Sequence, residues 1–235
     1  MEDGSLAAWE QDGGGGPFNS GGATTTVTDA IAHSGAWSAV ASLPTGSGGA
    51  RLFRWAEPRA HRDLYYESWY FFPQAFTLVG SEGAFLDFFQ FKSISEDGLQ
   101  NDPIWHLNVH NREDGSMVPE LVWWHRTLEG PHQGESGYRK FVDDLATLPV
   151  GRWFKVTARL RQSSGFDGRI SVWLDHNLIF DQQGVRTGYH NCTYNSWCVD
   201  QHWSVNFYSD GLVPSPSVIY IDDARIREVT SCRSR

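Results

Sequence analysis

The stretch Ile104-Trp105-His106-Leu107-Asn108-Val109-His110 alternates large apolar and polar side chains without a break. Successive side chains of a β-strand point to opposite faces of its sheet, so this alternation is typical of a strand with one buried face and one open face. The pattern predicts Trp105, Leu107 and Val109 in the core, and His106, Asn108 and His110 in a row on the opposite face.

Two other stretches, 85–92 and 203–208, alternate in the same way. In each, one face is aromatic or aliphatic and the other carries amide, basic or phenolic groups. An ordinary solvent face is richer in Thr, Lys, Glu and Ser, so these rows are typical of a groove lining. None of the predicted rows contains a carboxylate. The outward rows are Phe88, Gln90 and Lys92 in the first stretch, and Ser204, Asn206 and Tyr208 in the second.

Further short strands follow throughout the chain, separated by turn sequences such as Asp114-Gly115 and Asp167-Gly168. This pattern predicts an all-β protein, a β-sandwich of two antiparallel sheets, with residues 1–235 in a single domain. The only helical turn that we predict lies at Lys140 to Leu145. The predicted strands are Trp37–Leu43, Arg51–Trp55, Leu64–Phe72, Phe85–Lys92, Ile104–Asn111, Pro119–Arg126, Trp153–Arg161, Ile170–Leu174, Leu178–Asp181, Ser204–Tyr208 and Val218–Glu228.

Composition and charge exclude two classes of partner. The net charge is −9 and no run of five basic residues occurs, which argues against a nucleic-acid partner. No stretch approaches 18 apolar residues, so no membrane span is expected. Aromatic residues make up 14% of the chain, which favours sheet over helix. An anionic polysaccharide remains possible as a partner, because a few local cations suffice to bind it.

The cysteines bear on the cellular compartment. Cys192 and Cys198 bracket a short loop, and the favoured interpretation is a local disulfide formed in an oxidising compartment. Two free thiols, or a zinc site that adds His190 and His202, are the alternatives. Cys232 is left over near the end of the chain. No signal peptide is present at the start, so secretion is inferred from the expected disulfide. We also expect the protein to be a monomer.

Four motifs in order resemble a known family. They are Gln90-Phe91-Lys92, Asn101-Asp102-Pro103-Ile104, the stretch 148–154, and the stretch 203–208. The chain is similar, over roughly residues 30–226, to jelly-roll polysaccharide lyases of the heparin lyase I-like, glucuronan lyase and alginate lyase groups. The resemblance implies a concanavalin-like jelly roll with a concave groove. It also implies cleavage of a uronic-acid-containing polysaccharide by β-elimination.

The same resemblance implies roles for individual residues. Gln90 matches a residue that neutralises the substrate carboxylate, and Tyr208 matches a catalytic acid that can also serve as base. Lys92 stands where the alginate lyases carry a histidine base. The base therefore stays open among His106, His110, Lys92 and Tyr208, with imidazole favoured because it titrates near neutral pH. Lys92, Asn108, Arg54, Asn206, Trp124 and Arg126 are expected to contact the sugar.

The two ends of the chain resemble sugar-binding jelly rolls that hold a structural calcium ion. The similar segments are residues 2–9, Ala32-His33-Ser34-Gly35 and Tyr220-Ile221-Asp222-Asp223. The resemblance implies Ca²⁺ bound by Glu2, Asp222 and Asp223, which offer the hard oxygen ligands that this ion prefers. The alternative is that these are solvated acids beside a turn.

Two other functions compete with a lyase. A non-catalytic carbohydrate-binding module is favoured by the calcium-like termini and by the 11 tryptophans. A retaining jelly-roll glycoside hydrolase needs two neighbouring carboxylates on one strand face. The sequence has no Glu-x-Asp-x-Glu pattern, and the predicted rows lack acids, so the hydrolase is the least favoured of the three.

Overall fold

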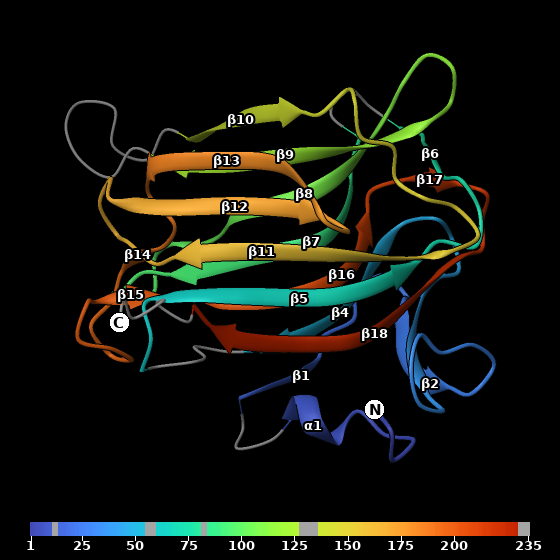
Figure 1. Cartoon of the computed structure of the whole chain (residues 1–235), viewed down its shortest axis with the longest axis horizontal. Helices are drawn as coiled ribbons and strands as arrows, with labels where there is room; N and C mark the ends of the chain where they lie inside the picture. The colour runs from blue at the N-terminus through green and yellow to red at the C-terminus, as the bar shows by residue number, and fades with distance from the viewer. Residues whose placement is uncertain (11–13, 55–59, 81–83, 127–135, 230–235) are drawn as a thin grey trace, which may run out of the picture.

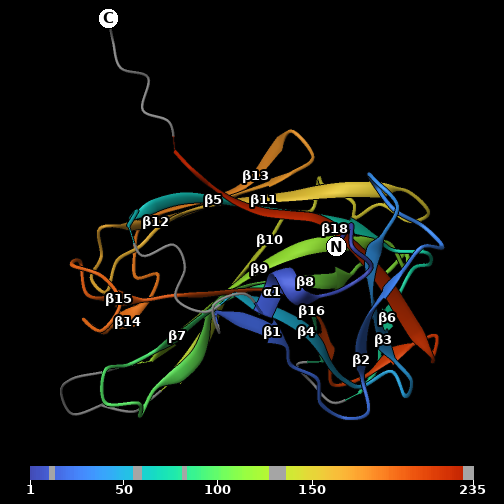
Figure 2. The ribbon, with the colours of Figure 1, turned by 90° about the horizontal axis from the view of Figure 1, so that it is seen from below.

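Two antiparallel sheets of seven strands each face one another in the computed structural model, which describes residues 1–10, 14–54, 60–80, 84–126 and 136–229. Trp55, at the end of one predicted strand, and Cys232 lie outside the described residues. Figures 1 and 2 show the two sheets as the layers of a sandwich, with the short helix α1 (Ala7–Glu10) at one edge. The β-sandwich prediction is confirmed.

Sheet A forms the layer that carries the predicted polar rows. In spatial order its strands are β1 (Gly15–Pro17), β4 (Gly48–Arg54), β16 (His202–Ser209), β7 (Leu86–Ile94), β8 (Asn101–Asn111), β9 (Met117–Arg126) and β10 (Ser136–Val142).

Sheet B forms the other layer, which lies toward the viewer in Figure 1. Its order is β13 (Asn177–Val185), β12 (Gly168–Leu174), β11 (Trp153–Arg161), β5 (Asp63–Phe71), β18 (Ser217–Glu228), β3 (Ser38–Leu43) and β2 (Thr24–Thr28). Two small ribbons complete the described structure, namely β14 (Tyr189–His190) with β15 (Val199–Asp200) and β6 (Thr77–Leu78) with β17 (Leu212–Val213).

The core lies between the sheets and is strongly aromatic. Trp105, Leu107 and Val109 of β8 belong to it, so the alternation predicted for this strand is confirmed. Aromatic rings of both sheets pack edge to face, for example Tyr70 of β5 against Phe88 of β7 at 5.4 Å between centroids. The core holds sheet A rigidly, so its outer face can position functional groups.

A β-bulge corrects the alternation predicted for β7. Asp87 pairs with Asn108 and Phe89 pairs with Leu107, so two steps along β7 match one step along β8. Because of this extra residue, Phe88 turns into the core beside Phe89, and the prediction that Phe88 faces outward is wrong. Asp87, on the other side of the bulge, turns to the face that carries Gln90.

The predicted helical turn at Lys140 is also wrong. Lys140 lies in strand β10, which pairs with β9 at the edge of sheet A from Ser136 to Val142. Strand β10 is mostly exposed, as is common for an edge strand. Its sequence therefore lacks the alternation of apolar and polar residues that marks a half-buried strand. Among the described residues, no helix is long and apolar enough to cross a membrane.

Candidate functional site

A cavity of about 490 Å³ lies on the outer face of sheet A. Five neighbouring strands line it, from β16 across β7, β8 and β9 to β10, so it runs across the sheet rather than along one strand. Its lining is Phe85, Asp87, Gln90, Asp102, Pro103, His106, Asn108, Val122, Trp124, Tyr138, Lys140 and Tyr208.

Strand register explains why these side chains meet. In one transverse row, Gln90 lies opposite His106, His106 opposite Val122, and Val122 opposite Lys140. In the next row, Tyr208 lies opposite Asp87, and Asp87 opposite Asn108. Directly paired residues on one face of a sheet have adjacent side chains, so the two rows form one continuous polar floor.

Asp87 is the buried centre of this floor. Its Oδ2 accepts hydrogen bonds from the Gln90 amide at 2.7 Å and from the Asn206 amide at 3.1 Å, whereas Oδ1 has no partner among the described residues. Burial raises the pKa of Asp87 to about 8, against the opposing effects of Arg51 and Asn206. Asp87 is therefore a neutral acid at neutral pH, and it orients the amide of Gln90.

Asp87 also corrects the expectation that the rows contain no acid. The bulge in β7 brings it to this face, and Glu120 of β9 follows Asn108 in the same transverse row. A one-residue bulge leaves no mark in the sequence pattern. The only available signal was an aspartate inside an otherwise aromatic strand, where an unpaired charge is costly.

His106 lies beside this network as an uncharged base. Its Nδ1 is 3.0 Å from Oδ1 of Asn108, which as an acceptor selects the tautomer protonated at Nδ1. Nε2 is buried and has no hydrogen-bond partner in the described part of the chain. Burial lowers the pKa of His106 to about 4, and the charge of Lys140 adds to this effect despite the opposing bond to Asn108.

Tyr208 lines the cavity from β16, and Arg51 lies over its ring. The Arg51 guanidinium carbon is 4.0 Å from the ring centroid, and the ring packs against Phe85 on its edge at 4.9 Å. Arg51 is itself largely buried on the neighbouring strand β4. It therefore brings a positive charge to the Tyr208 end of the cavity.

The structure does not bring every predicted site residue into this cavity. His110 lies farther along β8, where its Nδ1 is 3.8 Å from Glu120 and its side chain is 45% exposed. Arg54 donates hydrogen bonds to the carbonyl oxygens of Ala8 and Trp9, and it lines a different cavity near the chain start. Arg51, not Arg54, is the arginine of β4 that faces Tyr208.

The remaining predicted contact residues surround the cavity. Lys92 is not in its lining, but it is half-buried on β7, where burial and the charge of Arg51 lower its pKa. Asn206 is fully buried beneath Asp87 and positions it. Lys140, which the sequence analysis missed, lies on the opposite side with its Nζ 3.1 Å from Glu120.

Trp124 connects this cavity to a second one of about 470 Å³. Its ring meets Tyr138 edge to face at 4.4 Å. Arg126 lines the second cavity and holds Asp102 through two hydrogen bonds of 3.0 Å each. The two cavities share Trp124 in their linings and so are neighbours on this side of the molecule.

The acids predicted to hold calcium all contact the turn at His33–Gly35. Asp222 Oδ2 accepts the amides of His33 and Ser34, while Asp223 contacts the His33 ring at 2.6 Å. Glu2 accepts the amide of Ala36 at 2.8 Å. These are hard oxygen ligands of the type that suits Ca²⁺. Their present partners are N–H groups and the Ser34 hydroxyl, and the three acids do not form a group of close metal-type ligands in the described part of the chain. The calcium ion stays a prediction.

The predicted disulfide between Cys192 and Cys198 is confirmed. Both sulfurs are used in this bond, so the alternative of a zinc site on their thiolates is wrong. Among the described residues, the only group of three close metal-type ligands consists of these cysteines and His190. His202 instead lies 3.0 Å from Asp200.

Several solved structures share the fold. The endo-β-1,4-glucuronan lyase of the fungus Trichoderma reesei superposes with a TM-score of 0.66 at 12% identity, covering 92% of this chain and 91% of that one. A mutant of the alginate lyase Aly36B in complex with alginate trisaccharide gives 0.56 at 14%, covering 96% and 92%. The alginate lyase of a Chlorella virus gives 0.52 at 11%, covering 87% and 89%.

These identities are low, so the likenesses establish the jelly-roll fold and nothing finer. No curated protein matches the chain significantly. Family comparison reaches further, because residues 20–225 match the polysaccharide lyase family. That span includes every residue of the polar floor and all of both sheets except β1 and the end of β18, and the chain therefore belongs to the polysaccharide lyase family.

Proposed function

We propose that this enzyme cleaves a uronic-acid-containing polysaccharide by β-elimination, with the polymer lying across sheet A. The observation that carries the proposal is the cavity in which Gln90, His106 and Tyr208 meet. An amide, an uncharged imidazole and a phenol are the groups that this elimination needs. The similar structures are named for glucuronan and alginate, which are polymers of uronic acids.

Charge stabilisation falls to the amides and to neutral Asp87. The proton to be removed is attached to the carbon that bears the carboxylate, and its loss spreads negative charge onto the carboxylate oxygens. Gln90 is held by the bond that it donates to Asp87, and Asn108 by the bond that its Oδ1 accepts from His106, so their remaining N–H groups stabilise that charge without reorganising. Because Asp87 is uncharged at neutral pH, it does not repel the substrate.

Proton transfer falls to His106 and Tyr208. Nε2 of His106 takes the proton, the released electron pair forms a carbon–carbon double bond, and the bond to the glycosidic oxygen breaks. The Tyr208 hydroxyl donates its proton to that oxygen. Exchange with water then resets both groups. Water does not attack the sugar, so no pair of ionised carboxylates is required, in contrast to a glycoside hydrolase.

The proposal predicts an unsaturated product. We expect absorbance of the new double bond to rise when the protein is incubated with glucuronan, alginate or another polyuronate, and to stay flat with a neutral glucan. The assay is continuous ultraviolet absorbance with product analysis by mass spectrometry. Products carrying an added water molecule would contradict the proposal in favour of hydrolysis, and binding without any cleavage would leave only a carbohydrate-binding module.

Calcium at the termini is a second part of the proposal, supported by the oxygen ligands of Glu2, Asp222 and Asp223 around one turn. A ligand at 100 times its Kd stabilises the folded state by about 2.7 kcal/mol. We therefore expect excess calcium to raise the melting temperature above that in chelator, and Asp222→Asn to abolish the difference. Identical melting curves with calcium and with chelator would remove the ion from the proposal.

Secretion, an anionic substrate and a monomeric state complete the proposal. The Cys192–Cys198 disulfide supports an oxidising compartment. Arg51, Lys92 and Lys140 around the floor support an anionic polymer. Size-exclusion chromatography with light scattering measures the oligomeric state.

A further inference from the structure

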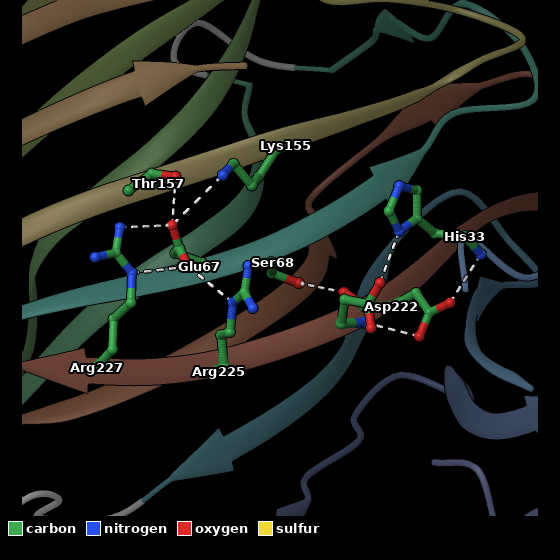
Figure 3. Close-up of polar contacts among 9 residues, drawn as sticks. His33, Glu67, Ser68, Lys155, Thr157, Asp222, Arg225 and Arg227 are labelled. Carbon is green, nitrogen blue, oxygen red and sulfur yellow. Dashed lines mark hydrogen bonds and ion pairs between the residues drawn. The ribbon is translucent and has the colours of Figure 1, made fainter. Parts of the chain in front are cut away.

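The outer face of sheet B carries a cluster of cations around one buried carboxylate. Glu67 of β5 is only 2% exposed, and three cations from the two adjacent strands converge on it (Figure 3). Lys155 of β11 lies 3.5 Å from Oε1, Arg227 of β18 lies 3.0 Å from the same oxygen, and Arg225 lies 2.8 Å from Oε2. This cluster is on the side of the sandwich opposite the groove.

Strand register places a tryptophan in the same row. Arg225 lies opposite Glu67, Glu67 opposite Thr157, and Thr157 opposite Trp173. The row therefore runs across four strands, from a cation on β18 to an aromatic ring on β12. Such a row on one sheet face presents its side chains side by side.

The cluster has more positive charge than its own carboxylate needs. Burial alone would raise the pKa of Glu67, but the hydrogen bond from Arg227 and the charges of Lys155, Arg227 and Arg225 outweigh it and lower the pKa to about 2. Glu67 is thus charged at neutral pH, and it balances only one of the three cations. The side chains of Arg225 and Arg227 are 60% and 49% exposed, so their remaining N–H groups face solvent.

A cleft of about 390 Å³ lies beside the cluster. Tyr65 and Trp173 form its aromatic wall, with 6.1 Å between ring centroids, and Lys155 and Arg227 line it as well. Asp175 is the other carboxylate in the lining, and Arg152 pairs with it at 3.2 Å. The two carboxylates of the lining are matched by Lys155 and Arg227. Arg225 and Arg152 lie outside the lining, pair with those carboxylates and add two further positive charges beside the cleft.

From this geometry we propose that the cleft on sheet B is a second, non-catalytic binding site for the uronate polymer. Guanidinium groups bind carboxylates with directed, charge-assisted hydrogen bonds, and the half-buried Trp173 ring offers apolar contact to the C–H face of a sugar. The inference rests on the proposed function for the identity of the polymer. Two attachment points on opposite faces raise the retention of long chains but leave short ones unaffected.

A purely structural ion-pair network is the competing explanation. One carboxylate in a network of that kind needs one cation, and the exposed Arg225 would add little to stability or to any binding. The two explanations differ in what Arg225→Gln does. In the second-site explanation it weakens polymer binding, while Glu67 keeps Lys155 and Arg227 and the fold persists.

The experiment measures polymer retention in affinity gel electrophoresis, with polyglucuronate or alginate in the gel at low salt. Arg225→Gln and Trp173→Ala are each placed in a Tyr208→Phe background, so that the polymer is not degraded. Arg161→Gln, which removes a half-exposed cation from the same sheet away from the cleft, is the matched control. Melting temperatures verify folding.

We expect both variants, Arg225→Gln beside the cleft and Trp173→Ala in its lining, to bind the polymer about tenfold more weakly than the Arg161→Gln control, which corresponds to about 1.4 kcal/mol. Calorimetry with a uronate tetrasaccharide should count one site fewer in Trp173→Ala. Retention equal to the control in both variants overturns the inference. The absorbance assay on the unmodified protein separates the two proposals: cleavage with unchanged retention rejects only the second site, whereas lost retention without cleavage rejects only the lyase chemistry.

Discussion

Replacing Tyr208 with phenylalanine should lower kcat/KM on a polyuronate by about 10³-fold, because a positioned general acid contributes about 10²–10⁴-fold to a rate. The substitution removes only the hydroxyl. The ring keeps its contacts with Arg51 and Phe85, so we expect the free energy of unfolding to change by less than about 1 kcal/mol. Initial rates of absorbance and melting curves provide the two measurements.

Tyr138→Phe is the matched control for this loss. Tyr138 lines the same cavity, is largely exposed, and contacts Trp124 through its ring. Removal of its hydroxyl should change turnover no more than a few-fold. Retained activity in Tyr208→Phe, or an equal loss in both variants, would remove Tyr208 from proton transfer.

Much of this site follows from strand alternation alone. Two predicted rows face one cavity: His106 and Asn108 on β8, and Tyr208 on β16. They do so because core and outward side chains alternate regularly along both strands as far as these residues. Large apolar residues such as Trp105 and Leu107 separate the polar ones, so each residue could be assigned to one face of the sheet from the sequence. Gln90 joins them through direct pairing with His106.

The sequence could not show features that depend on how strands pair or on which strand lies at the edge of the sheet. Asp87 reaches the floor only through a bulge, and a bulge depends on how two strands pair rather than on either sequence. Lys140 lies on an edge strand whose exposure conceals its period. For His110, alternation gave the correct face of the sheet, but its distance along β8 separates it from the cavity, and no periodicity measures that distance.

Asp87 also predicts a pH dependence of stability that its neighbours do not share. Its folded pKa of about 8 lies above the ordinary value of 3.8, so between these pH values the folded state holds a proton that the unfolded chain has released. Stability from this group is fully present at low pH and is lost as the pH rises from about 4 toward 8. The total loss is on the order of 5 kcal/mol.

Asp87→Asn should remove this loss. Asparagine keeps an oxygen that accepts from Gln90 and Asn206, and it has no proton to lose. At pH 9 we therefore expect the variant to melt roughly 10 °C or more above the unmodified protein, with the two curves converging toward pH 4. The measurement is the melting temperature of both proteins across this pH range.

Asp102→Asn is the control of opposite sign, since it removes the negative charge and one of the two oxygens that accept from Arg126, and should lower the melting temperature at neutral pH. The same titration of Asp87 should limit catalysis, because an ionised Asp87 repels the substrate carboxylate. Above about pH 8, kcat/KM of the unmodified enzyme should therefore fall, while that of Asp87→Asn stays level. If the difference in melting temperature between the two proteins did not vary with pH, Asp87 would be ionised in the folded state over the whole pH range. The polar floor would then carry a negative charge that repels the uronate.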